Sequence, residues 1–374
     1  HLGAPGLTIS LEIMELFTRL PHSSTWLPTP RVGLIFAYYA ALLLLVNHWR
    51  KKRTLFVATA ALLAGISFLF ILPPYELTKP FKKDLTVSFL DVGQGSATLL
   101  EFPGGYRILI DGGGSSAASR TVGETVIAPF LWQKGITRLD LIVVTHPDSD
   151  HYNGLPFILE RFSPAVLWTN SLDASDRPYA QLLEQARRQQ IQMNMPMKGE
   201  HLEIGRGRLT CIRNLSADSG TRSGEGGKGN DRGLVIQARL GRFALLFPGD
   251  IGQSIERELT DTDEDLAATI LLSPHHGSKT SNSQTFLTAV APEYLIVSAG
   301  SLQSAHFPHP GLERQCEGLG ISMMTTGRDG TIIAATDGNR FTVTTPINTG
   351  NDRRVAQQSG TEQAAMSKVA GSPP

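Results

Sequence analysis

Apolar residues follow two different patterns along the chain. Residues 32–49 and 54–72 form two almost uninterrupted apolar runs, each with enough residues to cross the hydrocarbon core of a bilayer as a helix. Only the basic residues 50–53 separate the runs, so the positive-inside rule predicts a transmembrane hairpin with its turn in the cytoplasm. A buried hairpin of a soluble protein is the alternative, although core helices rarely lack charge over such a length.

A second pattern begins near residue 84. Short strand-like segments alternate with amphipathic helical segments up to about residue 345, which is typical of an α/β domain. We therefore expect four regions: an N-terminal segment with an amphipathic helix (1–31), two transmembrane helices (32–73), an α/β domain (84–346) and a disordered tail (347–374). Because the chain begins with His1 rather than Met, we expect a fragment of a longer protein.

The densest group of potential metal ligands directly follows the apolar strand expected at 139–145. The segment 146–151, His-Pro-Asp-Ser-Asp-His, supplies two imidazoles and two carboxylates. This mixed set of nitrogen and oxygen ligands suits zinc or manganese, and so compact a loop can fold around two adjacent cations. A polar turn that caps a helix is the alternative, but it explains only one Asp or Ser.

Three later segments place further ligand types at the ends of expected strands. Asp250 ends a Phe-Pro-Gly-Asp segment and offers a carboxylate that can bridge two cations. His275 and His276 are tandem imidazoles, and Asn230-Asp231 can add an oxygen ligand. Each segment alone is weak evidence, since a Gly-Asp pair is more often an ordinary turn. Loops at strand ends converge in an α/β chain, however, so together they predict one site.

The motifs resemble the C-terminal domain of the ComEC family of DNA-internalisation competence proteins. The resemblance is carried by FLDVGQGS at 89–96, IDGG at 110–113, HPDSDH at 146–151 and HHGS at 275–278, which follow membrane spans in the family order. It covers roughly residues 32–345 and implies the αββα sandwich of the metallo-β-lactamase fold. The hallmark of that fold is His-x-His-x-Asp-His, and Asp148 stands here where the second His is usual.

The resemblance also implies a bound pair of divalent metal ions, zinc or manganese. The implied ligands are His146, Asp148, Asp150, His151, Asp250 and one of His275 or His276. Asn230 or Asp231 falls where the fold usually supplies another His, so we include Asp231 as a candidate ligand. The site is then richer in oxygen ligands than a standard zinc site, which favours manganese more than a His-rich site would.

Two residues are candidates for catalysis at such a centre. Two metal ions can lower the pKa of a water between them, and Asp150 could orient that water for attack on phosphorus or a carbonyl. His309 is a candidate general acid for the leaving group, although an incidental histidine in a surface loop is the more frequent case. The Gly-x-Ser-x-Gly signature of a serine-hydrolase elbow is absent from the sequence.

Composition restricts the partners and the redox chemistry. The formal net charge is zero, so an anionic substrate has to be held locally, although a basic groove remains compatible with a neutral chain. Cys211 and Cys316 match no zinc-cluster spacing. We expect two unpaired core cysteines, and a disulfide outside the cytoplasm is the alternative.

Three further features stay open. The glycine-rich segments 92–96 and 111–114 are tight turns or contacts to a substrate phosphate. The loop 216–232 is a mobile lid or an exposed insertion, and Lys279 is a phosphate contact or a solvated side chain.

The residues predict a metal-dependent hydrolase, and the resemblance implies its substrate and its location in the cell. It implies a nuclease that processes DNA during uptake across the inner membrane in natural transformation, with its catalytic domain on the periplasmic or extracellular side and other DNA-uptake proteins as partners. A cell-surface phosphodiesterase that acts on wall or lipid phosphoesters is one alternative. The other is a vestigial hydrolase domain of a DNA-transport protein, which the Asp at position 148 keeps open.

Overall fold

The structure is a computed structural model. It describes residues 3–18, 29–30, 32–48, 53–71, 83–114, 121–172, 176–214, 233–300 and 307–346. The predictions for Asn230, Asp231, the loop 216–232 and the tail 347–374 lie outside the described residues. The boundaries of the four expected regions therefore stay a prediction.

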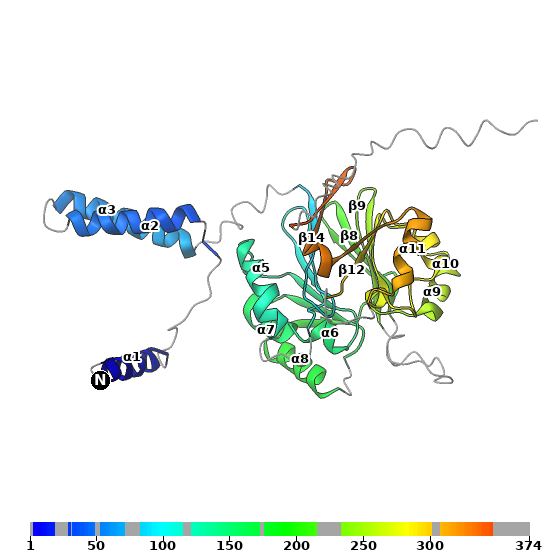
Figure 1. Ribbon diagram of the computed structural model, residues 1–374, viewed down its shortest axis with the longest axis horizontal. Coiled ribbons are helices and arrows are strands. Elements are labelled where there is room, and N and C mark those ends of the chain that lie inside the picture. The colour runs from blue at the N-terminus through cyan, green and yellow to red at the C-terminus, as the bar shows by residue number, and fades with distance from the viewer. Residues whose placement is uncertain are drawn as a thin grey trace, which may run out of the picture. The chain divides into compact units, whose positions relative to one another are not determined.

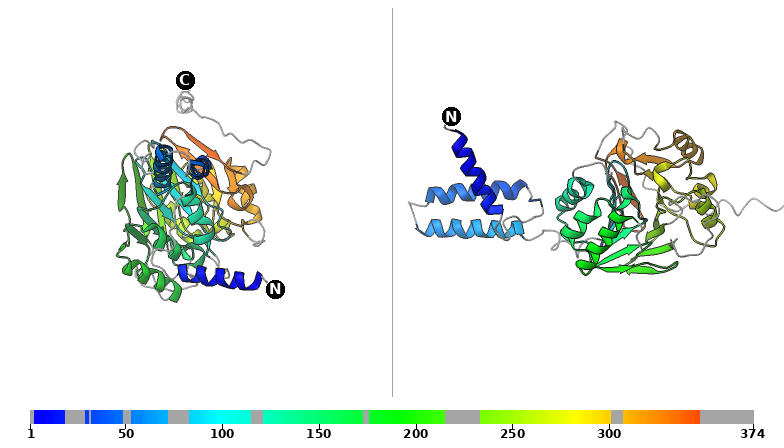
Figure 2. Two further views of the ribbon diagram at one scale, coloured as in Figure 1. Left: turned by 90° about the vertical axis from the view of Figure 1, so that its left-hand side faces the viewer. Right: turned by 90° about the horizontal axis from the view of Figure 1, so that it is seen from below.

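The chain forms two compact units. One comprises His1–Glu76 with Leu131–Thr137, and the other comprises Leu77–Phe130 with Arg138–Pro374. Figures 1 and 2 show three helices of the first unit in blue, and the larger α/β unit from cyan to orange.

The described part of the first unit is helical. It contains α1 (Gly3–Thr18), α2 (Val32–His48) and α3 (Arg53–Ile71), and α2 packs against α3. The two apolar runs thus form helices, as expected. Among the helices that the structure describes, none is both long enough and apolar enough to cross a membrane. The described helices therefore do not support the expected transmembrane hairpin.

The second unit is built from two mixed sheets. The eight-stranded sheet has the order β15-β14-β1-β2-β3-β4-β5-β6 and is antiparallel from β15 to β3 and parallel from β3 to β6. Its strands are β1 (Leu85–Phe89), β2 (Thr98–Glu101), β3 (Arg107–Ile110), β4 (Leu141–Val144), β5 (Val166–Thr169), β6 (Gln192–Asn194), β14 (Ile332–Thr336) and β15 (Phe341–Thr344).

The seven-stranded sheet has the order β13-β12-β11-β10-β9-β8-β7. It is antiparallel from β7 to β10 and parallel from β10 to β13. Its strands are β7 (His201–Ile204), β8 (Gly207–Asn214), β9 (Leu234–Leu240), β10 (Phe243–Phe247), β11 (Ile270–Leu272), β12 (Tyr294–Val297) and β13 (Ser322–Thr325).

Amphipathic helices cover the outer faces of the two sheets. In α7 (Leu155–Phe162) the buried residues recur at positions i, i+3, i+4 and i+7, and α8 (Arg177–Arg188) has the same spacing, which gives each helix one apolar face. In Figure 1, α7 and α8 lie outside the first sheet, whereas α9 (Gln253–Thr260), α10 (Gln284–Val290) and α11 (Pro310–Leu319) lie outside the second. The αββα sandwich expected from the resemblance is therefore confirmed. The remaining short helical segments are η2 (Gly123–Ile127), α5 (Ala128–Gln133), α6 (Ser149–Tyr152), η4 (Pro274–Gly277) and α12 (Thr326–Asp329).

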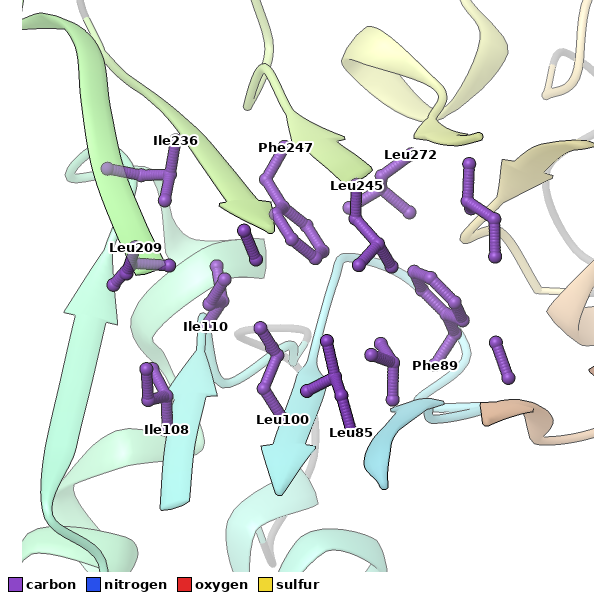
Figure 3. Close-up of a cluster of buried hydrophobic side chains, with 14 of the residues drawn as sticks. Leu85, Phe89, Leu100, Ile108, Ile110, Leu209, Ile236, Leu245, Phe247 and Leu272 are labelled. Atoms are coloured by element: carbon purple, nitrogen blue, oxygen red, sulfur yellow. The ribbon is translucent and has the colours of Figure 1, made fainter. Parts of the chain in front are cut away.

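Strand β10 shows why the central strands are apolar throughout. Phe243, Leu245 and Phe247 belong to the cluster between the sheets, whereas Ala244 and Leu246 belong to the cluster under the outer helices. Successive side chains of a strand point to opposite faces, so a strand buried on both sides needs apolar residues at every position. Figure 3 shows side chains of both sheets pointing into the space between them.

Both cysteines are buried and unpaired, as expected. Cys211 lies in the cluster between the sheets, and Cys316 lies in the cluster under the outer helices. Burial raises the pKa of Cys211 to about 12 and that of Cys316 to about 11, so both remain protonated thiols at neutral pH.

We predict that Leu245→Ala lowers the free energy of unfolding by about 2–5 kcal/mol, because it leaves a cavity in a packed core. Leu245 has an exposed fraction of 0%. Urea denaturation of the full chain measures the loss. The control is Thr288→Ala on the exposed face of α10, which we expect to change the free energy by less than about 0.5 kcal/mol. Equal effects of the two substitutions would contradict this account of the core.

Candidate metal centre

The candidate centre lies where strands of both sheets end. His146 follows β4 of the first sheet, whereas Asp250 follows β10 and His276 follows β11 of the second sheet. The short helix α6 after β4 carries Asp150 and His151. Polar residues from these three strand ends meet, although more than a hundred residues separate the first from the last.

Asp250 lies in the middle of the cluster. Its Oδ1 lies 3.2 Å from Nε2 of His151, and its Oδ2 lies 3.5 Å from Nε2 of His276 and 3.8 Å from Nε2 of His146. The exposed fraction of each of these four side chains is 1% or 5%. One buried carboxylate therefore faces three imidazole nitrogens, which is a suitable geometry for a ligand shared by two cations.

Two further carboxylates, both more exposed than that of Asp250, complete the cluster. Oδ2 of Asp150 lies 3.3 Å from Nε2 of His276, and Oδ2 of Asp148 lies 3.6 Å from Nε2 of His146. The side chain of Asp150 is 24% exposed and that of Asp148 is 43% exposed. These two residues therefore form the open side of the centre, through which a substrate can approach.

Hydrogen bonds outside the cluster determine which imidazole nitrogen faces it. Nδ1 of His151 lies 2.8 Å from Oδ2 of Asp111, and Nδ1 of His276 lies 2.9 Å from the backbone oxygen of Ser298. Both of these oxygens can only accept, so each Nδ1 carries a proton. In the neutral form of each ring, Nε2 then presents a lone pair to the centre, as in metal-bound histidines.

Thr145 orients the third imidazole in the same way. Its hydroxyl donates to Oδ2 of Asp111 over 2.9 Å, because a carboxylate can only accept. The same hydroxyl lies 3.0 Å from Nδ1 of His146 and accepts the proton of that nitrogen. Nε2 of His146 is buried without a hydrogen-bond partner in the described part of the chain. A buried lone pair of this kind is costly unless a ligand occupies it.

The residues fit divalent metal ions. Ligand atoms of His146, His151 and Asp250 lie within 4.8 Å of one another, and so do those of Asp150, His151 and His276. Because Nδ1 of His151 is bonded to Asp111, its Nε2 can serve only one ion. Two ions would therefore have to share a carboxylate, and Asp250 is placed to provide it. Imidazoles combined with carboxylates suit zinc and manganese.

The electrostatics keep the carboxylates ionised. Burial by itself raises the pKa of Asp250, but the imidazoles of His151, His276 and His146 hold it well below its usual value. Burial also raises the pKa of Asp150, and the neighbouring His276 and His151 again outweigh it, so this pKa is lowered too. Ionised carboxylates are the form that binds metals.

The segment 93–96 holds Asp150 in place. Nε2 of Gln94 donates to Oδ2 of Asp150 over 3.2 Å, and the backbone nitrogen of Ser96 donates to the backbone oxygen of Asp150 over 3.2 Å. A Cβ atom at Gly95 would lie 1.9 Å from that same backbone oxygen, so only glycine fits there. Gly95 of the sequence motif thus permits this close approach to Asp150.

The tandem histidines lie in a strained turn. His275 has a φ of 50° and His276 a φ of 53°, in the left-handed region that residues with a Cβ rarely adopt. Asn282 holds the turn, since its Nδ2 donates to the backbone oxygen of Pro274 over 3.1 Å, and its Oδ1 accepts from the hydroxyl of Ser273 over 2.8 Å. These bonds direct His276 towards Asp250.

The structure brings six of the expected site residues together. They are His146, Asp148, Asp150, His151, Asp250 and His276. His275 lies beside this cluster and outside both groups of ligand atoms. Nδ1 of His309 accepts from the backbone nitrogen of Gly311 over 3.2 Å and caps α11. Asp231, the remaining candidate, lies outside the described residues.

Sequence reasoning missed Asp111, Thr145 and Gln94. Asp111 directly follows β3, which runs parallel to β4, so its position after a strand next to the ligand-bearing strand was the available signal. Gln94 lies in a motif that was singled out for its glycines and for the family resemblance, and neither pointed to its side chain. The role of Thr145 carries no signal in the sequence. It depends on the contacts of its hydroxyl with Asp111 and His146, which only the folded chain brings together.

Comparisons with known proteins agree with this architecture. The chain is 26% identical over 316 residues to ComE operon protein 3 of Bacillus subtilis, which covers 82% of this chain and 39% of that protein. It is 27% identical over 300 residues to competence protein ComA of Neisseria gonorrhoeae, with 80% and 38% covered. It is 31% identical over 234 residues to recombination protein 2 of Haemophilus influenzae, with 63% and 26% covered.

The chain thus spans less than two fifths of the length of these curated relatives. The resemblance to competence proteins that the motifs indicated is confirmed by these homologues. The family model described as the metallo-beta-lactamase superfamily matches residues 90–301, which include every ligand-type residue of the cluster. On this match and on the αββα sandwich, the chain belongs to the metallo-beta-lactamase superfamily.

Proposed function

We propose that this chain is a metal-dependent phosphodiester hydrolase, and that it acts as a nuclease on DNA during uptake. The observation that carries the proposal is the convergence of three imidazole Nε2 atoms on the buried carboxylate of Asp250. Relatives named as a competence protein and a recombination protein support DNA as the substrate. Proteins of the DNA-uptake machinery are the partners that we propose with it.

We propose two divalent ions, zinc or manganese, as the cofactors. His146 lies beside Asp148 and His276 lies beside Asp150, and both imidazoles face Oδ2 of Asp250. Asp250 is the proposed shared ligand, and His151 serves one of the two ions. Asp231 stays a candidate ligand for the ion beside His146 and Asp148. Bound ions of this kind supply Lewis acidity at a scissile phosphate.

The protein side chains have separate tasks in the proposed reaction. Asp150, held by Gln94 and ionised at neutral pH, can orient the attacking water. His309 is the proposed general acid. Because its Nδ1 accepts a hydrogen bond from Gly311, the neutral ring carries its proton on Nε2, which is then the atom that can donate to a leaving group.

We also propose that α2 and α3 attach the chain to the inner membrane, with the catalytic unit on the periplasmic or extracellular side. The support is chemical: α2 contains no charged residue and exposes large apolar side chains, with Phe36 73% exposed and Leu43 72% exposed. Apolar surface of this extent is costly in water and needs a cover. The basic residues 50–53 between the helices support a cytoplasmic turn.

We predict that Asp150→Ala lowers DNA cleavage by at least about a hundredfold, because it removes both a ligand and the group that orients the water. The assay follows plasmid and single-stranded DNA with Mn²⁺ or Zn²⁺, and bis-p-nitrophenyl phosphate in parallel. Asp263→Ala, at an exposed position, is the matched control. Circular dichroism checks that both variants fold. Full activity of Asp150→Ala would refute the site assignment.

We predict that metal affinity rises with pH. Burial lowers the pKa of His151, but the carboxylates of Asp250 and Asp111 raise it well above 6.5 in the metal-free protein. A metal has to displace that proton, so affinity increases by roughly tenfold per pH unit until the raised pKa is passed. Calorimetric titration of Zn²⁺ at several pH values measures it. Asp111→Asn should shift the rise to lower pH, and an affinity independent of pH would contradict the prediction.

We predict that the full chain floats with liposomes, and that the pair Phe36→Lys and Leu43→Lys strongly reduces flotation. A lysine at the centre of a membrane helix costs about 2.5–3.5 kcal/mol. The control is Met197→Lys, since Met197 is 75% exposed on the catalytic unit. Unchanged flotation of the double variant would show that these helices do not attach the chain.

A further inference from the structure

An aromatic pair borders the candidate centre. The ring of Phe307 lies 5.9 Å from that of His275, at an interplanar angle of 35°, and 6.3 Å from that of His276, at 76°. His276 is buried and faces Asp150 and Asp250. Phe307 and His275 are both half-buried, and both lie next to His276, a residue of the centre.

Local packing fixes this pair relative to the centre. The backbone nitrogen of His309 donates to the backbone oxygen of Gly277 over 2.8 Å. A Cβ atom at Gly277 would lie 2.8 Å from Pro308, so the two segments are in close contact. The residue after Phe307 is thus packed against the turn that carries His275. Rings held in this way lose little conformational freedom when a ligand binds.

Neither ring belongs to the ligand set. His275 lies outside both groups of ligand atoms, and phenylalanine binds no metal. From this geometry we infer that His275 and Phe307 form a stacking subsite for the base next to the scissile phosphate, which makes single-stranded DNA the substrate. The inference rests on the proposed nuclease function and adds the strandedness to it.

Charge and stacking chemistry both favour this subsite. The chain has a formal net charge of zero, and two carboxylates, Asp148 and Asp150, lie on the open side of the centre. The net charge therefore provides no overall attraction for a polyanion, and local contacts have to hold the strand. Stacking on aromatic rings is independent of charge and tolerates any base. A base inside a duplex has both faces covered by its neighbours, so only an unpaired base can use an aromatic ring beside the centre.

A purely structural role for Phe307 is the competing explanation. The side chain also packs against the apolar cluster that includes Leu312 and Cys316. Such a role would make a substitution of Phe307 equally harmful for every substrate. Stacking instead predicts a loss that depends on whether the substrate carries bases.

The experiment compares two oligonucleotides of equal length with the metal-loaded full chain. One is ordinary single-stranded DNA, and the other carries abasic residues around the cleavable phosphates. We expect the KM of the wild-type chain for the abasic oligonucleotide to be on the order of tenfold higher. In Phe307→Leu, which keeps an apolar side chain, that ratio should fall towards one. Metal content and circular dichroism are measured for each variant.

Phe341→Leu is the matched control. Phe341 is also half-buried and contacts two aromatic rings. It pairs with Thr336, and Thr336 pairs with Leu85 at the start of β1. Phe341 thus lies at the strand ends opposite the centre. This variant should keep the wild-type ratio.

The outcomes separate the two proposals. Equal KM values of the wild type for both oligonucleotides would overturn the stacking subsite alone, and so would a ratio that Phe307→Leu leaves unchanged. Faster hydrolysis of duplex than of single-stranded DNA would overturn the strandedness. Hydrolysis of neither oligonucleotide would overturn the proposed nuclease function, and this inference with it.

Discussion

The buried carboxylate of Asp250 is the constraint on which the rest of the centre depends. A carboxylate removed from water destabilises a fold unless opposite charges or hydrogen bonds compensate it. Here the compensation comes from three imidazoles within 3.2–3.8 Å, and they belong to two different sheets. The centre and the sandwich therefore stabilise each other, because neither sheet alone supplies both the carboxylate and all of its partners.

Asp111 lies behind the ligand-type residues and orients two of their imidazoles. Its carboxylate bonds to Thr145 and to His151, and through Thr145 it also determines the orientation of His146. Asp111 has a φ of 59°, and both tandem histidines also have positive φ angles. Each such residue costs on the order of 1–3 kcal/mol, and strain of this kind is found where surrounding structure holds a functional geometry. Asp111, His275 and His276 lie at the centre, whereas Ser163 and Ala291, which also have positive φ angles, end helices.

The proposed separate sites for the phosphate and for the base follow from this arrangement. The buried cluster accounts for chemistry at a phosphate, but it offers nothing that recognises a base. The half-buried ring of Phe307 lies next to His276 and differs in chemistry from every member of the cluster. The formal net charge of zero gives the chain no overall attraction for a polyanion, so local contacts have to hold the strand.

Much of this architecture is determined by the sequence itself. The apolar runs at 32–49 and 54–72 predicted two helices, and periodicity predicted the apolar strands. The segment 146–151 with Asp250 and the tandem histidines indicated the ligand types. These are local properties, since side-chain alternation and ligand chemistry are visible in neighbouring residues. They were sufficient for an α/β domain and for the family resemblance, which implied the αββα sandwich.

The tertiary structure decided what depends on contacts between distant residues. It placed His276 rather than His275 among the ligand atoms, assigned orienting tasks to Asp111, Thr145 and Gln94, and gave His309 a capping bond. The physical reason is that the protonated nitrogen of an imidazole, the direction of a strained turn and the end of a helix are set by hydrogen bonds and packing from other parts of the chain.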